Sequence, residues 1–357
     1  MTTQEKRPQR DHDPDHDTDT DTDINPTIEV VLPDMFILFL SQPPCVNAYY
    51  EYVRRESEAW LSRVCNFDLQ SREILSKTDF SYFCAVAVPD AGPEELRTVC
   101  DWVFDNGHLK ADPLRAQKVV NRLLSGMGMK NDARELDGAC TADEDALVEV
   151  HNSVWLRVAK SSPIGVQRRF AKAMRDYCYG SIEQVHTRFW GKDPSVEEML
   201  AMRRRSAGVA PLFALADCKK VNKLDLSDAV FENRSIQEIE RIGIDLAKRH
   251  SLLLQGREGV RHNLVAICCH THGMRTQRAF DHLGAMLAAR YRDWYLALAD
   301  LPTWDEQIDA EVQQYIRAVQ NVAMANLNWS FRSERYFGPA HDRIRRSRVV
   351  SVMQRPW

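Results

Sequence analysis

The chain has 357 residues, of which 44% are hydrophobic, enough for one large core or two modest ones. Its net charge of −4 is unevenly distributed: residues 1–25 carry eight acidic and three basic side chains, so the remainder is close to neutral. A nearly neutral body without a basic stripe argues against nucleic acid as a partner.

The cysteines and the apolar stretches indicate where the protein resides. Nine cysteines occur without a C-x-x-C spacing, and no secretory apolar stretch stands at the N-terminus. We therefore expect reduced, mostly buried thiols in a cytoplasmic protein. The most apolar stretch, residues 30–40, is interrupted by Pro33 and Asp34 and is shorter than the roughly 18 residues that a membrane span needs. We expect no membrane span.

The N-terminal stretch is acidic and of low complexity. Aspartates alternate with other residues over 11–23, where almost nothing apolar is available for burial. We expect residues 1–29 to form a disordered acidic tail. Cation binding, with His12 and His16 beside the carboxylates, is the alternative role for this tail.

From Pro43 onward the hydrophobic pattern is helical almost throughout, and strand patterns are nearly absent. Short links rich in Gly, Pro and Asp separate the helices, with no strong linker and no repeat of fixed period. The sequence predicts one all-α domain over residues 30–357. The expected helices cover residues 48–64, 93–104, 112–128, 144–160, 163–190, 195–208, 235–255, 276–302 and 304–331.

An aromatic segment with two arginines lies near the C-terminus, at 326–338. Arg335 stands beside Tyr336 after an apolar helix, and together they could present a fork of N–H donors and a hydroxyl to a phosphate oxygen. The alternative is an aromatic helix end with solvated arginines.

Two further segments gain meaning only in combination. In 199–215, three arginines precede a Ser-Ala-Gly sequence, and Gly208 would break a helix there; the alternative is a surface charge run before a turn. In 245–265, Ala247, Ser251 and Gln255 fall on one helical face, although only the last two carry side-chain oxygens.

Asp101 and Asp105 are four residues apart in the stretch CDWVFDNGHL. At this spacing two carboxylates share a helix face and could bind one or two Mg²⁺ ions together. The alternative is the solvated edge of an ordinary helix.

In this order and at these separations, the segments resemble fungal class I terpene cyclases, the enzymes that ionise farnesyl diphosphate. The C-terminal motif of that family, N-x-x-W-S-x-x-S-x-R-Y-F-G, is present from Asn326 to Gly338, and HNLV follows the second metal motif at 262–265. The resemblance covers roughly Pro43 to the end. It implies a single-domain class I helical barrel around a central apolar cavity.

The resemblance also implies roles for particular residues. Arg204, four residues before Gly208, would sense the diphosphate, with Ala207 in the linker position of the helix break. Arg335 and Tyr336 would bind the diphosphate oxygens, and these three residues would be catalytic. The implied ligands of the Mg²⁺ cofactor are Asp101, Asp105, Ser251 and Gln255.

The sequence departs from both metal motifs of the family. In N-D-x-x-S-x-x-x-E, Ala247 replaces the Asn and Gln255 the Glu, which weakens Mg²⁺ binding. In D-D-x-x-D, Trp102 replaces the second Asp, and the preceding run is shorter by about two helical turns. A different placement of this gap would leave only Asp105 equivalent.

Aromatic faces lining a dry cavity would stabilise an allylic cation without trapping it. Core packing is the alternative role for each candidate, and the candidates are Phe80, Tyr82, Trp102, Phe104, Trp329 and Phe331.

Degenerate metal motifs on this frame look like the non-canonical α-humulene synthases of meroterpenoid pathways. That likeness implies closure of the farnesyl cation between C1 and C11 and loss of a proton. The partners would be farnesyl diphosphate and diphosphate, with the protein a monomer or homodimer. Two alternatives stay open: a catalytically silent helical protein that binds a prenyl diphosphate or a partner protein, and a prenyl-chain-elongating synthase, which would carry a second Asp-rich motif.

Overall fold

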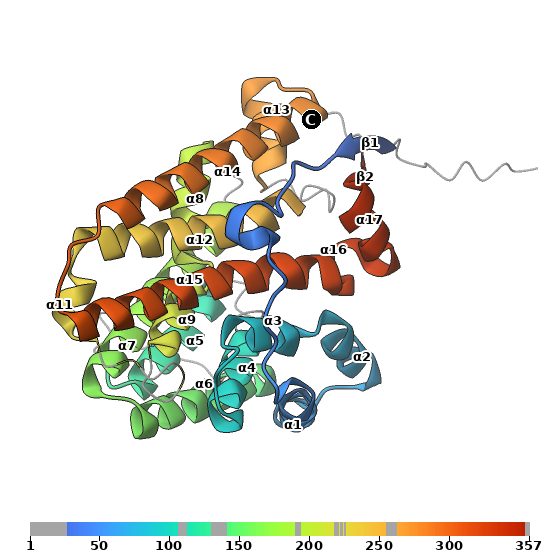
Figure 1. Cartoon of the computed structure of the whole chain (residues 1–357). Helices are drawn as coiled ribbons and strands as arrows, with labels where there is room; N and C mark the ends of the chain where they lie inside the picture. The colour runs from blue at the N-terminus through green and yellow to red at the C-terminus, as the bar shows by residue number, and fades with distance from the viewer. Residues whose placement is uncertain are drawn as a thin grey trace, which may run out of the picture.

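The part of the chain that the structure describes is helical apart from one two-stranded sheet, as Figure 1 shows. The computed structural model describes residues 27–105, 113–129, 141–189, 194–217, 221, 224, 226–254 and 263–353. Within these residues the all-α prediction is confirmed, and no described helix is both long and apolar enough to cross a membrane.

The helices begin at recognisable residues. Pro93 occupies the first position of the helix Pro93–Asp105 and is followed by two glutamates, as predicted. Capping boxes at Thr141 and Ser195 begin two other helices. The α-helices are α1 (Tyr50–Val64), α2 (Leu69–Thr78), α3 (Phe80–Ala87), α4 (Pro93–Asp105), α5 (Pro113–Gly126), α6 (Ala142–Ser161), α7 (Ile164–Phe189), α8 (Val196–Arg205), α9 (Val209–Ala216), α11 (Asp228–Phe231), α12 (Arg234–Leu254), α13 (Leu264–His272), α14 (Thr276–Ala299), α15 (Glu306–Arg332), α16 (Glu334–Phe337) and α17 (His341–Ser347). Two short 3₁₀ helices are η1 (Leu38–Ser41) and η3 (Gly338–Ala340).

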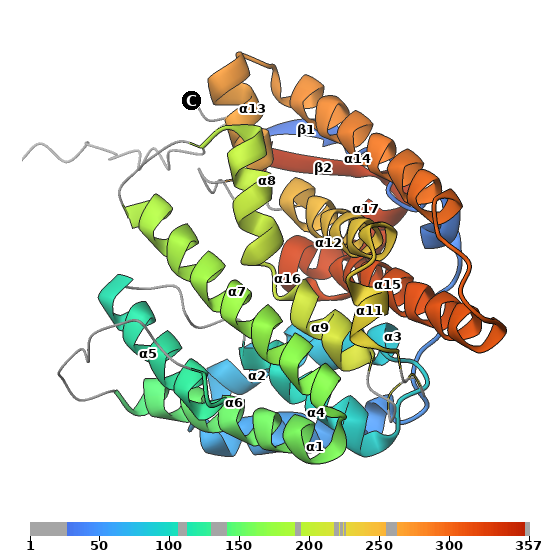
Figure 2. The same cartoon turned by 90° about the vertical axis from the view of Figure 1, so that its left-hand side faces the viewer.

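Three long helices form one half of the molecule. In Figure 1, α14, α12 and α15 lie one below the other, and α12 packs against both of its neighbours. Helices α1 to α6 lie beneath them, joined to α15 mainly through α3. Figure 2 shows the short α9 in the middle, packed against α7 on one side and against α12 and α15 on the other.

The two ends of the described chain meet in a sheet that the sequence analysis missed. Strand β1 (Thr27–Val31) pairs antiparallel with β2 (Val349–Met353). The side chain of Gln277 on α14 binds the free edge of β1, accepting from the amide of Val31 at 2.8 Å and donating to its carbonyl at 3.0 Å. Residues 27–29, which the sequence analysis placed in the acidic tail, belong to this strand. Residues 1–26 lie outside the described part.

Candidate active site

The predicted helix break is present between α8 and α9. Gly208 there has a φ of 68°, a backbone conformation that favours glycine, and Ala207 beside it is half-buried. Helix α7 approaches this break closely: a Cβ on Gly180 would lie 2.6 Å from the Cβ of Arg205 and 2.9 Å from the amide nitrogen of Ser206. A glycine in α7 thus allows the break to pack into the middle of the fold.

Arg204, on the last turn of α8, is held by a buried carboxylate of α12. Its Nε donates to Oδ1 of Asp245 at 2.6 Å and its Nη2 to Oδ2 at 2.9 Å. Arg290 of α14 approaches the same Oδ2 at 3.4 Å, and Asp245 is only 2% exposed. Two guanidinium groups on one carboxylate make this a charge-assisted, geometrically defined contact.

The neighbouring Arg205 has a different environment. It pairs with Glu183 of α7, and both side chains are about half exposed. Exposed pairs of this kind hold a side chain only weakly. Of these two arginines, Arg204 is the one directed toward α12.

The contact of Arg204 lies on one flank of α12. Asp245 is two residues before Ala247, so the two side chains leave the helix about 160° apart. Ala247 is fully buried in the hydrophobic core, where the resemblance expects an Asn ligand. The structure therefore does not bring Arg204 onto the helix side that carries Ala247.

Asp101 does not fit the metal-binding role that the sequence analysis assigned to it. The residue is fully buried, and Ser57 Oγ donates to its Oδ1 at 2.6 Å. Arg97 Nε lies 2.8 Å from both carboxylate oxygens, and Arg157 Nη2 lies 2.8 Å from Oδ2. Two arginines and a hydroxyl neutralise and occupy this carboxylate, so it has no free oxygen to offer Mg²⁺.

The Asp101 cluster joins α1, α4 and α6. The guanidinium groups of Arg97 and Arg157 lie 5.2 and 5.9 Å from the ring centre of Trp60 on α1. The cluster borders a pocket of about 460 Å³. The occupied oxygens of Asp101 are what the other placement of the sequence gap would expect, in which only Asp105 is equivalent to a residue of the Asp-rich motif.

The other predicted ligands lie beyond what the structure describes. Asp105 is the last residue of α4 and Ser251 lies in α12, but their side chains are outside the described part, and so is Gln255 altogether. Among the described residues, no group of three or more His, Cys, Asp or Glu side chains is placed to hold a metal ion. The sequence leaves a carboxylate, a hydroxyl and an amide oxygen as donors, which are hard oxygens of the type that Mg²⁺ prefers.

Arg335 and Tyr336 lie on α16, directly after α15. Arg335 is exposed, and its guanidinium carbon lies 5.7 Å from the ring centre of Tyr336. Tyr336 is buried, with its ring edge-on to Trp329 at 5.9 Å. The pair thus presents a solvent-accessible cation beside an aromatic ring that is packed into the fold.

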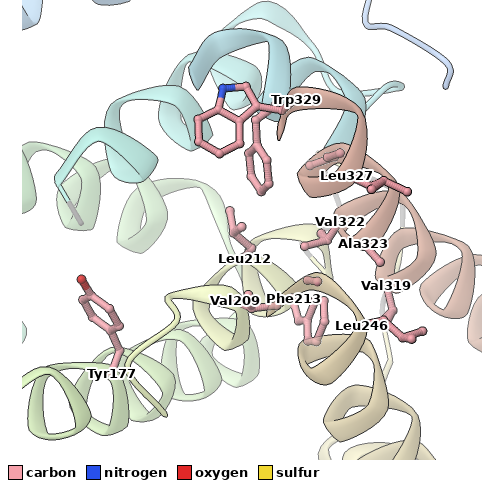
Figure 3. Close-up of a cluster of buried hydrophobic side chains, with 14 of the residues drawn as sticks. Tyr177, Val209, Leu212, Phe213, Leu246, Val319, Val322, Ala323, Leu327 and Trp329 are labelled. Atoms are coloured by element: carbon pink, nitrogen blue, oxygen red, sulfur yellow. The ribbon is translucent and has the colours of Figure 1, made fainter. Parts of the chain in front are cut away.

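Two of the predicted cavity aromatics form one cluster. Phe80 stacks on Trp329 at 5.0 Å between ring centres, and Trp329 Nε1 donates to the carbonyl of Thr78 at 2.6 Å. Figure 3 shows Trp329 above a set of labelled apolar side chains from three helices, with Tyr177 of α7 across from it. The labelled members of this set are Val209, Leu212 and Phe213 of α9, Leu246 of α12, and Val319, Val322, Ala323 and Leu327 of α15.

The remaining aromatic candidates pack as core residues. Trp102 is fully buried and its Nε1 donates to Met174 Sδ of α7 at 3.1 Å. Phe331 packs against Phe36 and Phe337, and Tyr82 lies under Arg332. The side chain of Phe104 lies outside the described part.

The sequence analysis missed the residues that hold the charged side chains. Arg97 could have been found, because it precedes Asp101 by four residues and so shares its helix face. No such local pattern reveals the contacts Arg157–Asp101, Arg204–Asp245 and Arg290–Asp245, since each joins two helices far apart along the chain.

The comparisons with known proteins identify relatives of the same architecture. Silphinene synthase peniA of Penicillium patulum is 35% identical over 340 residues, which cover 91% of this chain and 90% of that protein. The (+)-eremophilene synthase of Gibberella fujikuroi is 32% identical over 342 residues, covering 91% and 93%. Among solved structures, an α-eudesmol synthase has a TM-score of 0.70 at 18% identity, covering 81% of this chain and 96% of that one, a likeness of fold.

A family description covers more than half of the chain. Residues 95–293 match the family model described as terpene synthase family 2, C-terminal metal binding. This range contains Arg204, Gly208 and Asp245. Together with the relatives, the match shows that the chain belongs to the terpene synthase family and is a class I terpene cyclase, a lyase that releases diphosphate.

Proposed function

We propose that the protein ionises farnesyl diphosphate with the help of Mg²⁺ and cyclises the resulting cation to a sesquiterpene hydrocarbon. The observation that carries this proposal is Arg204, fixed by Asp245 at a helix break that borders an apolar interior. Relatives that are named silphinene and eremophilene synthases support the substrate class.

In the proposed reaction, the bond between C1 and the diphosphate oxygen breaks and its electron pair leaves with the diphosphate. Arg204, Arg335 and Tyr336 donate hydrogen bonds to the departing oxygens, where charge develops. Mg²⁺, when bound, would neutralise part of this charge, and Asp105, Ser251 and Gln255 are the residues that would hold it. Asp101 is not among them, because its oxygens are occupied.

The apolar side chains drawn in Figure 3 would exclude water from the allylic cation, with Trp329 and Phe80 offering aromatic faces. We propose α-humulene as the product, formed by closure between C1 and C11 and loss of a proton. This choice follows from the likeness to the non-canonical α-humulene synthases.

A catalytically silent prenyl-diphosphate binder is the second candidate. Two observations favour it: the loss of Asp101 as a ligand, and a relative from Gibberella fujikuroi, 30% identical over 353 residues, that is named an inactive guaia-6,10(14)-diene synthase. In this alternative, the arginines would bind the diphosphate without ionising it.

Incubation of the purified protein with farnesyl diphosphate, with Mg²⁺ and with EDTA, separates the two candidates. We expect a C15 hydrocarbon by gas chromatography–mass spectrometry in the Mg²⁺ arm alone, and its loss in Asp105→Ala and in Arg335→Ala. No hydrocarbon from either C15 or C20 diphosphate would support the silent binder. A C15 hydrocarbon other than α-humulene would correct the product alone.

A further inference from the structure

Four consecutive residues, 77–80, form the corner between α2 and α3, and every one of them contacts the end of α15 or the start of α16. We name residues 77–80 the α2–α3 corner, and residues 329–337 the terminal segment. The contacts are Lys77 Nζ to Glu334 Oε2 at 3.9 Å, the Thr78 carbonyl to Trp329 Nε1 at 2.6 Å, Asp79 Oδ2 to Arg332 Nε at 3.9 Å, and the Phe80 ring to the Trp329 ring at 5.0 Å.

Asp79 adopts an unusual backbone conformation at this corner. Its φ of 48° and ψ of 52° lie in the left-handed region, which residues other than glycine rarely occupy. Its buried carboxylate accepts from the amide of Tyr82 at 3.1 Å and from the hydroxyl of Tyr50 at 2.7 Å, with Arg54 at 3.5 Å. Such a conformation persists only where the surroundings determine it strongly.

The hydroxyl contact is stable at neutral pH. Burial, with a further contribution from the Asp79 carboxylate, raises the pKa of Tyr50 to about 12. Tyr50 therefore remains a donor to Asp79, and the corner stays attached to α1.

The terminal segment needs support from outside itself. Helix α16 has four residues, and a single helical turn is unstable without tertiary contacts. Its exposed Arg335 lies over Tyr336, Tyr336 packs edge-on against Trp329, and Trp329 is held by the corner. A continuous series of described contacts thus connects residues 78–80 to the guanidinium of Arg335.

We infer that the α2–α3 corner positions Arg335 and Tyr336 for diphosphate, with Asp79 as the positioning residue, an inference that rests on the proposed role of these two side chains in diphosphate binding. Asp79 does not touch the ligand in this arrangement. It fixes the corner against Arg332 and α1, and the corner in turn fixes Trp329 and α16.

The test uses Asp79→Asn, with Asp68→Asn as the matched control. Asparagine tolerates the left-handed conformation and can still accept from the Tyr82 amide, but it lacks the charge that attracts Arg332 and Arg54. Asp68 caps the other end of α2 by accepting from the amide of Ser71 at 2.7 Å, away from the terminal segment. Both substitutions remove one charge from α2 or its boundary.

The first readout is calorimetric titration of the full-length protein with inorganic diphosphate in the presence of Mg²⁺. We expect Asp79→Asn to raise the dissociation constant about tenfold, and Asp68→Asn to leave it within about twofold. In an Arg335→Ala background, Asp79→Asn should cause a clearly smaller further loss, because the part of its effect that passes through Arg335 is already gone and only the part through Tyr336 remains. Equal losses in both backgrounds, or no loss in either, would overturn the inference.

The second readout is hydrogen exchange of residues 329–340 without any ligand. We expect faster exchange there in Asp79→Asn than in Asp68→Asn, and unchanged exchange would overturn the inference even if the enzyme is active. If Asp79→Asn does not fold, Trp329→Phe removes the hydrogen bond to Thr78 while keeping an aromatic ring, with the same outcomes expected. A wild-type protein that binds diphosphate but forms no hydrocarbon would refute the proposed function and leave this inference standing.

Discussion

Asp101 and Asp245 are both buried aspartates, each flanked by two arginines, yet the two clusters are built differently. Asp101 receives Arg97, Arg157 and a hydroxyl at 2.6 to 2.8 Å, with donors on both oxygens. Asp245 has one close arginine, Arg204, and a more distant one, Arg290 at 3.4 Å. The first cluster is closed around its carboxylate.

In the second cluster, Arg204 is the group that can still bind a further partner. Arg204 uses one edge of its guanidinium, Nε and Nη2, in the contacts that the structure describes. The opposite edge, with Nη1, has no partner among the described residues, so its N–H groups can donate hydrogen bonds to an anion. The comparison teaches that a buried aspartate can be the counter-charge of a functional arginine as readily as a ligand itself.

The largest effect should follow Asp101→Ala. It leaves Arg97 and Arg157 without their counter-charge, and breaking a buried pair in this way costs about 3–5 kcal/mol. Urea unfolding measures the loss. Asp145→Ala, which breaks the exposed pair with Arg122, should cost less than about 1 kcal/mol. If Asp101→Ala loses no more stability than Asp145→Ala does, Asp101 would again count as an available metal ligand.

Next in size is Arg204→Ala, compared with Arg205→Ala. Loss of a donor to the departing diphosphate should lower kcat/KM about 100-fold, roughly 2.7 kcal/mol. Arg205 pairs with Glu183 on the surface, so its removal should change kcat/KM by less than about threefold. Steady-state release of diphosphate gives both values, and equal losses in the two variants would contradict the distinction between these neighbours.

A smaller effect is expected for Ser57→Ala. The Ser57 hydroxyl donates to Oδ1 of Asp101. Deleting one hydrogen bond to a charged group costs about 1.5–3 kcal/mol. The cost should lie at the low end here, because both carboxylate oxygens of Asp101 keep their contacts with arginine. Thermal unfolding should show a lower midpoint than in Thr98→Ala, which removes a hydroxyl bound to the backbone of α4 on its exposed side. Equal midpoints would mean that the two arginines alone maintain the cluster.

The smallest effect concerns Glu240, a half-buried acid whose hydrogen-bond partner is the Tyr315 hydroxyl rather than an arginine. Burial raises the pKa of Glu240, against the lowering effects of Tyr315 and of Arg169 and Lys172 nearby. The folded state therefore holds this proton to higher pH than the unfolded state does. The stability linked to it is lost as pH rises from the ordinary value of 4.5 through the raised pKa.

Glu240→Gln cannot ionise and should remove that loss. Its stability relative to the parent should increase with pH, as measured by urea unfolding at several values between pH 4 and 8. Parallel pH profiles for the two proteins would show that the Glu240 carboxyl titrates alike in the folded and unfolded states.

The helical architecture was accessible from the sequence because it depends on local patterns. Pro93 with its two glutamates predicts the start of α4, and Gly208 predicts the break after α8. The short strand at 27–31 was not predicted, because its hydrogen-bonding partner lies near the opposite end of the chain. Patterns read along the chain contain no information on such a pairing.

The site was predictable in its residue types but less so in its pairings. The sequence predicts a shared helix face for Asp101 and Asp105, but Asp101 also shares a face with Arg97, and Arg157 on α6 binds the same carboxylate. The choice between a metal ion and an arginine depends on which helix faces that surface. The distance to Gly208 drew attention to Arg204 in the sequence, whereas its counter-charge on α12 could be found only from the packing of α8 against α12.

The pairing of β1 with β2 also constrains the order in which the protein can mature during synthesis. When residues 27–31 leave the ribosome, their complement has not yet been translated, so the edge of that segment must wait until residue 353 has emerged. Helices formed from neighbouring residues can assemble long before then. The two-stranded sheet can thus form only late in synthesis, and its hydrogen bonds then connect residues 27–31 to residues 349–353.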